Sequence, residues 1–93
     1  MIQGFACTET EGLFGGRTAR RLPASIQRTA RRKLLQLHAA VSLADLAVPP
    51  GNRLEPLRGN RAGQHSIRVN DQWRICFRWQ GSDAHEVEIV DYH

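Results

Sequence analysis

The hydrophobic pattern changes its period once along the chain, and this change restricts the fold more than any other feature. From residue 65 onward, apolar and polar residues alternate in three runs, at residues 65–69, 73–79 and 85–91. Alternation with a period of two predicts strands that bury one face. The polar segments 70–72 and 80–83 predict turns, so we expect the three strands to form an antiparallel meander.

Before this region, apolar residues recur at steps of three and four, which predicts a helix opened by Pro23. The apolar stripe consists of Ile26, Ala30, Leu34, Leu37 and Val41. A shorter helix is expected after a capping box of Thr8 and Glu11, and Gly15 with Gly16 is expected to end it.

Three smaller signals complete the expected element order. Residues 2–5 are expected to form a short first strand. Ser42 and Asp45 are expected to cap one further helical turn, which the segment Pro-Pro-Gly at 49–51 then stops. The pattern predicts an α+β fold of two layers, with the N-terminal helices packed on one face of an antiparallel sheet. The length of the chain, 93 residues, suits one domain that spans residues 1–93 and has one modest core.

Keeping the apolar residues of all three strands on one face fixes the register of the sheet. The core face then holds Ile67, Val69, Trp73, Ile75, Phe77, Trp79, Val87 and Ile89. On the other face Arg68 lies opposite Arg74, and Arg78 lies opposite Glu86 as an ordinary ion pair. A like-charge pair is unfavourable unless a neighbouring group relieves it. Either a carboxylate such as Asp91 or a bound phosphate would relieve the repulsion between the two arginines, and we favour the phosphate.

The arginine content also points toward nucleic acid. The net charge is +4, and arginine supplies 12 of the 13 basic residues. The planar guanidinium group suits phosphate and stacks on bases. A GC-rich genome produces the same bias, so the composition alone does not show which arginines contact nucleic acid. Their positions in the fold must show this. Arg28, Arg31 and Arg32 lie off the apolar stripe and are predicted to form a solvated helix face.

Cys7 and Cys76 lie far apart, and the chain has no CxxC pair and no cluster of cysteine and histidine at zinc spacing. We therefore expect two reduced thiols, with a disulfide as the less favoured alternative, and no metal site. The first residues lack a basic stretch followed by an apolar block, and no apolar run approaches the roughly 20 residues that cross a bilayer. The sequence predicts a cytoplasmic protein with no membrane partner.

The sequence ends in Asp91, Tyr92 and His93, which should lie close to Arg74 after the last strand. Carboxylate, phenol, imidazole and guanidinium are the groups that metal-free RNA cleavage requires. A base takes the proton of the ribose 2′-OH, a cation stabilises the phosphoryl oxygens, and an acid protonates the leaving 5′-oxygen. A frayed tail is the alternative interpretation of His93.

Two longer stretches carry a resemblance to a known family. The run LRGNRAGQHSIRVNDQWRICF at residues 57–77 and the ending VEIVDYH at residues 87–93 resemble toxins of the HigB type, in the RelE/ParE superfamily. The segment at residues 49–54 and the strand at residues 1–5 fit as well. This resemblance implies a microbial-RNase-like fold and a growth-arresting endoribonuclease that uses no cofactor. Such a toxin cleaves mRNA in the A site of the 70S ribosome by attack of the 2′-OH group.

The resemblance also implies partners and site residues. The partner is a HigA-like antitoxin, a helix-turn-helix protein through which alone the toxin reaches operator DNA. Position assigns catalysis to Glu55, Arg58, Arg74, Asp91, Tyr92 and His93. Position assigns RNA or ribosome contacts to Arg53, Asn60, Arg61 and Arg68. Some members carry histidine where this chain has Glu55, so it stays open whether this carboxylate acts as a base or orients His93.

Two other functions compete with the RNase. A ParE-like toxin has the same fold but inhibits DNA gyrase without hydrolysis, and the Asp-Tyr-His ending argues against it. A plain RNA-binding module would contact the nucleic-acid backbone with its basic face and would not need His93.

Overall fold

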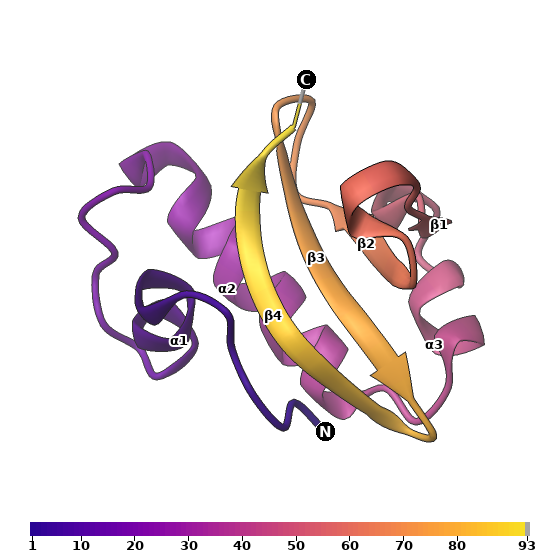
Figure 1. The fold of residues 1–93 in the computed structure, drawn as a ribbon. Coiled ribbons are helices and arrows are strands. Elements are labelled where there is room, and N and C mark those ends of the chain that lie inside the picture. Colours follow the sequence, from indigo (N-terminus) through magenta and orange to yellow (C-terminus); the bar gives the residue numbers. More distant parts are fainter. Residues whose placement is uncertain (93) are drawn as a thin grey trace.

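The computed structural model describes residues 1–92, in which three α-helices stand beside a four-stranded sheet (Figure 1). The helices are α1 (Thr8–Phe14), α2 (Ala24–Ala39) and α3 (Leu43–Ala47). The strands are β1 (Glu55–Pro56), β2 (Gln64–Arg68), β3 (Trp73–Gln80) and β4 (Asp83–Asp91). Two short 3-10 turns, η1 (Pro50–Asn52) and η2 (Gly59–Arg61), lie before and after β1.

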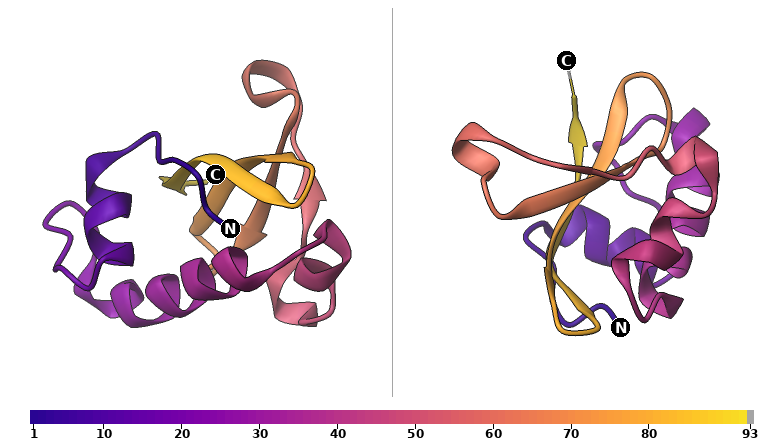
Figure 2. Two further views of the ribbon diagram at one scale, coloured as in Figure 1. Left: turned by 90° about the horizontal axis from the view of Figure 1, so that it is seen from below. Right: turned by 90° about the vertical axis from the view of Figure 1, so that its right-hand side faces the viewer.

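The sheet is antiparallel, and its strand order β1-β2-β3-β4 follows the chain. Figure 2 shows α2 running along one face of the sheet, with α1 beside it near the N-terminus. The α+β class and the two-layer arrangement are therefore confirmed, as are the three strands of the meander. Strand β1 was not predicted, because two residues that include a proline carry no periodic signal.

The core lies between α2 and the sheet, as the two hydrophobic periods require. Ile26, Ala30, Leu34 and Leu37 are buried on α2, and the sheet buries Ile67, Ile75, Phe77 and Val87 against them. Val41 was wrongly placed in this stripe. Helix α2 ends at Ala39, so the Val41 side chain falls outside the helical period and is 70% exposed.

The predicted register is confirmed where β2 meets β3, because Arg68 lies opposite Arg74. The pairing predicted for Arg78 is wrong, since Arg78 lies opposite His85. A register shift between Cys76 and Arg78 inserts one extra residue, and Glu86 adopts a left-handed backbone conformation with φ 52°. The ion pair survives this shift, with Arg78 Nε 2.6 Å from Glu86 Oε2.

Of the two predicted capping boxes, one is confirmed and the other is wrong. Ser42 and Asp45 form the predicted capping box at α3, where each side chain accepts a hydrogen bond from the other residue's backbone N–H. The capping box predicted at Thr8 is absent, because α1 begins one residue earlier, with Cys7 as its N-cap and no side-chain cap. Residues 2–5 make only two isolated parallel bridges to β4 instead of the expected strand.

Candidate active site

A pocket lies between β1 and the end of the described chain, and three predicted catalytic residues line it together with two apolar ones. The lining residues are Glu55, Pro56, Leu57, Arg58 and Tyr92. Strand β1 holds Glu55 in place by pairing it with Ser66 of β2, and the Leu57 N–H donates to the Gln64 carbonyl at 2.8 Å. The chain therefore brings a carboxylate, a guanidinium and a phenol around one hollow.

Arg74 contacts Tyr92, which lines this pocket. Its guanidinium carbon lies 5.2 Å from the centroid of the Tyr92 ring, in the range of a cation–π contact. The same guanidinium donates to the backbone carbonyls of Asn70 and, at 3.2 Å, of Trp73. These two carbonyls fix the direction of the Arg74 side chain.

Gln72, in the turn between β2 and β3, holds the end of β4 at two points. Its carbonyl accepts a hydrogen bond from the Tyr92 N–H at 2.6 Å, and its side-chain Nε2 donates to Asp91 Oδ2 at 3.1 Å. Asp91 lies opposite Trp73, so it faces the other side of the sheet from Arg74. His93 lies outside the described residues. Gln72 carried no sequence signal, since a glutamine in a polar turn is typical of solvent exposure.

The pair of Arg68 and Arg74 is relieved by a carboxylate, and that carboxylate is Asp71. Arg68 Nη2 donates to Asp71 Oδ1, and the Asp71 side chain is otherwise 98% exposed. This hydrogen bond and the charge of Arg68 hold the pKa of Asp71 below its usual value, and Arg53 and Arg74 lower it further. Asp91, which the sequence suggested as the alternative carboxylate, lies opposite Trp73 instead, and the bound phosphate that we favoured stays a prediction.

Arg61 and Asn60 lie apart from this group. Arg61 Nη1 contacts Glu88 Oε1 at 2.8 Å and Gln64 Oε1 at 3.1 Å, across the sheet face opposite α2. The hydrogen bond to Glu88 raises the pKa of Arg61, and both bonds commit its guanidinium to the protein itself. Asn60 is exposed in η2. The middle of this face is covered, since Cys76 is fully buried there.

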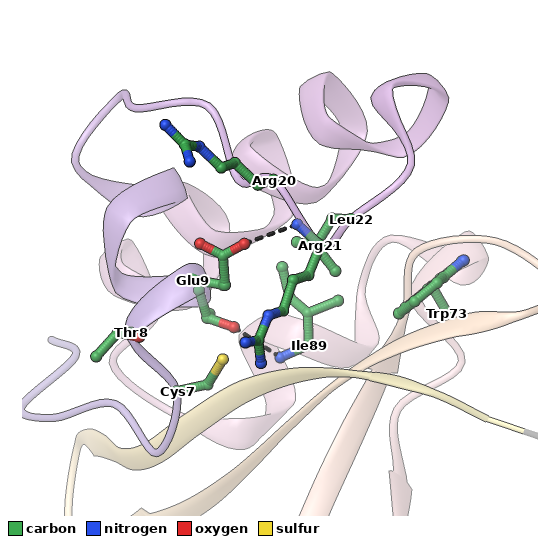
Figure 3. Close-up of a pocket in the computed structure, with 9 residues that line it drawn as sticks. Cys7, Thr8, Glu9, Arg20, Arg21, Leu22, Trp73 and Ile89 are labelled. Atoms are coloured by element: carbon green, nitrogen blue, oxygen red, sulfur yellow. Dashed lines mark hydrogen bonds between the residues drawn. The ribbon is translucent and has the colours of Figure 1, made fainter.

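A second hollow lies between α1, the segment before α2 and the end of β4 (Figure 3). Glu9 Oε1 accepts the backbone N–H of Arg21 at 2.7 Å, and the Thr10 hydroxyl accepts the Ile89 N–H at 3.0 Å. These two bonds attach α1 to its neighbours and shape the hollow. Its walls include Leu22, Trp73 and Ile89, and within residues 1–92 none of the predicted site residues lines it.

The remaining expectations concern thiols, metals and membranes. Cys7 and Cys76 are both free thiols, as predicted. Within residues 1–92, no three histidine, cysteine or acidic side chains gather as a metal site would require. No helix in this part of the chain is long and apolar enough to span a bilayer.

Comparison with known proteins gives a family and three relatives. Residues 12–93 match the sequence profile of a family described as the RelE-like toxin of the type II toxin–antitoxin system HigB. The protein named Toxin HigB-1 from Vibrio cholerae serotype O1 is 52% identical over 60 residues, which are 64% of this chain and 63% of the relative. Endoribonuclease HigB from Proteus vulgaris is 44% identical over 41 residues, which are 44% of this chain and 45% of the enzyme.

A protein from Haemophilus influenzae is 31% identical over 74 residues, which are 80% of this chain and 73% of that protein. The matched region of the chain therefore spans less than two thirds of the Vibrio toxin and less than half of the Proteus enzyme.

Proposed function

Because the chain belongs to the family of HigB-like, RelE-like toxins of type II toxin–antitoxin systems, we propose that it is an endoribonuclease that cleaves mRNA on the ribosome. This membership confirms the resemblance found in the sequence. One of the relatives bears the name of an endoribonuclease, which supports the same activity for this chain. The partners that we propose are the 70S ribosome with its mRNA and a HigA-like antitoxin.

The observation that carries the proposal is the pocket lined by Glu55, Arg58 and Tyr92, with Arg74 against the Tyr92 ring. The guanidinium of Arg58, a carboxylate, an aromatic ring and two apolar residues line this hollow, and the second guanidinium lies against the ring. Phosphate binds to guanidinium groups, and a base stacks on an exposed ring. The hollow therefore suits one nucleotide of a single strand.

In the proposed reaction, the ribose 2′-oxygen attacks the adjacent phosphorus and the bond from phosphorus to the 5′-oxygen breaks. The products are a 2′,3′-cyclic phosphate and a free 5′-hydroxyl end. Arg58 and Arg74 stabilise the negative charge that builds on the phosphoryl oxygens. Tyr92 stacks on a base or donates to the phosphate. No step uses a metal ion.

Two groups are available for the proton transfers. His93 is the main acid and base, since an ordinary imidazole titrates close to neutral pH. Glu55 either takes the 2′-OH proton or orients His93. Asp91 holds its neighbours in place through Gln72. The ribosome supplies the in-line geometry of the 2′-OH group, so free mRNA should be cut slowly.

The test is a translating extract to which purified protein is added, with mRNA ends mapped by primer extension. Cuts in phase with the codons are expected for the wild type, and Arg74→Gln and His93→Ala should lose about 100-fold or more of the cutting. Arg28→Gln removes the same charge from the exposed face of α2 and should cut normally.

Three other results would overturn the proposal. Intact mRNA together with inhibited DNA supercoiling would identify a gyrase inhibitor. Intact mRNA with retention of RNA would identify a binding module. Rapid cutting of naked RNA in the same pattern would contradict the dependence on the ribosome.

A further inference from the structure

The turn between β2 and β3 gathers three arginines around one carboxylate. Asp71 accepts a hydrogen bond from Arg68, Arg74 lies opposite Arg68 in the sheet, and Arg53 follows η1, which contacts β2. The charges of Arg53 and Arg74 both lower the pKa of Asp71. Arg53 comes from the end of η1, Arg68 from the end of β2 and Arg74 from the start of β3. Residues distant in sequence thus meet at one corner of the sheet.

This group carries more positive than negative charge. Three arginines share this corner with one carboxylate, which contacts Arg68, so two positive charges remain without a counterpart within the group. The charge of Arg68 also acts on Lys33 of α2. Burial lowers the pKa of Lys33 most, and the charges of Arg32 and Arg68 lower it further. A second anion at this corner would therefore be attracted.

The carboxylate already present is easily displaced. The Asp71 side chain is 98% exposed, and its partner Arg68 is held mainly in the sheet. Exposed ion pairs contribute little to stability because water screens both charges. A phosphodiester offers two anionic oxygens and forms two parallel hydrogen bonds with one guanidinium, which is a better fit than one carboxylate oxygen.

We propose that Arg53, Arg68 and Arg74 form a second phosphate-binding site beside the pocket, and that the Asp71 carboxylate occupies this site until a nucleic-acid phosphate displaces it. Arg74 lies opposite Arg68 in the sheet and against the Tyr92 ring, so the phosphate bound here belongs to a nucleotide that flanks the one in the pocket. That its natural ligand is mRNA rests on the proposed function. Asp71 then acts as an internal competitor that weakens RNA binding.

The probe is a fluorescently labelled single strand of six deoxythymidines, which has no 2′-OH and is not cleaved by the proposed reaction. Its affinity for the full chain is measured by fluorescence anisotropy at a fixed low salt concentration. Asp71→Asn is expected to bind about threefold more tightly than the wild type, since the competing charge is gone. Arg53→Gln is expected to bind about threefold more weakly, since a phosphate contact is lost.

Matched controls distinguish binding at this site from a general effect of net charge on affinity. Asp83→Asn removes the same charge at the far end of β4, where Asp83 contacts the N-terminal amine at 3.1 Å. Arg20→Gln removes the same charge as Arg53→Gln at another exposed position. Each control should change the affinity by less than half as much as its partner variant. Equal effects within either pair, or no tighter binding by Asp71→Asn, would overturn the proposal.

This outcome is independent of cleavage. If Asp71→Asn tightens oligonucleotide binding but no mRNA is cut on ribosomes, the phosphate site stands and the nuclease proposal fails. If mRNA is cut but Asp71→Asn binds no more tightly, the nuclease stands and the competitor role of Asp71 is wrong.

Discussion

Arg74 lies against the face of Tyr92, with its guanidinium carbon 5.2 Å from the ring centroid. The arginine comes from the start of β3, and the tyrosine follows the end of β4, so two antiparallel strands deliver the pair to one corner. The contact joins a charged group to an aromatic ring that lines the pocket. Two contacts at this corner and two buried side chains elsewhere in the fold can be tested with designed variants.

The Tyr92 ring should matter more than its hydroxyl. Tyr92→Phe keeps the surface that packs on Arg74 and stacks on a base, whereas Tyr92→Ala removes it. Stacking of one base on an aromatic ring is worth about 1–3 kcal/mol, so we expect Tyr92→Ala to lower mRNA cleavage by roughly 5- to 150-fold. Tyr92→Phe should stay within about fivefold of the wild type. If both variants lose the same activity, the hydroxyl carries the role and stacking is wrong.

Gln72 should order the chain that follows β4. Gln72→Ala removes the bond from Nε2 to Asp91 and leaves the backbone bond to Tyr92 in place. Tyr92 is the single tyrosine of the chain, so its ring signals in an NMR spectrum report on this corner without assignment. We expect these signals to shift toward those of an unstructured tyrosine, with a stability loss of about 1 kcal/mol.

The matched control for this experiment is Gln80→Ala, at the exposed far end of β3. It should leave the tyrosine signals unchanged. Indole signals of the two tryptophans should stay in place in both variants, since the core does not depend on Gln72. Unchanged tyrosine signals in Gln72→Ala would show that the backbone bond alone holds the strand end.

The sequence predicted the elements that have a clear period. The helix of residues 24–39 and the three long strands follow from apolar spacing, because burial of one face imposes that spacing. Strand β1 was not predicted, since its two residues are too few to show a period. The partner of Arg78 was wrong because the bulge adds one residue to β4, so that the buried residues Ala84 and Val87 are three positions apart, and the residue pattern alone did not show this.

The site was predictable only in part. Glu55, Arg58 and Tyr92 came from the family resemblance, and the structure adds that they line one pocket. Asp71 and Gln72 were missed because polar residues in a turn are normally there for solubility and turn formation. Their hydrogen bonds depend on how the turn is placed against the end of β4, which residue spacing does not specify.

Burial of Cys76 should make the protein less stable at alkaline pH. Burial raises the pKa of this thiol above its ordinary value of 9.0, so the folded chain keeps a proton that the unfolded chain releases. The stabilisation is therefore complete below about pH 9 and is lost as the pH rises through the raised pKa. Cys76→Ala should lack this loss while keeping all other titrating groups.

The measurement is urea denaturation of both proteins at several pH values between 7.5 and 10. The difference in free energy of unfolding between wild type and Cys76→Ala should shrink above pH 9. Taking the difference removes the opposite contribution of Lys33, whose pKa burial lowers. A constant difference across this range would mean that the thiol titrates normally in the folded protein.

Asn52 should be the most sensitive polar position of the fold. Its side chain is fully buried, accepts a hydrogen bond from Lys33 Nζ and donates to the Leu46 carbonyl at 3.1 Å. Asn52→Ala leaves the Lys33 ammonium without this partner in a site that already disfavours its charge. Removing one partner of a buried charged hydrogen bond costs about 3 kcal/mol or more, so urea denaturation should show a loss of this size.

Two further variants locate the cause of that loss. Asn60→Ala changes an exposed asparagine in η2 and should stay within about 0.5 kcal/mol of the wild type. Adding Lys33→Met to Asn52→Leu removes both partners, and apolar replacement of a buried polar pair is often nearly neutral. The double variant should therefore be more stable than Asn52→Ala. If it is less stable, the loss comes from the packing of η1 against α3 and not from the unpaired ammonium.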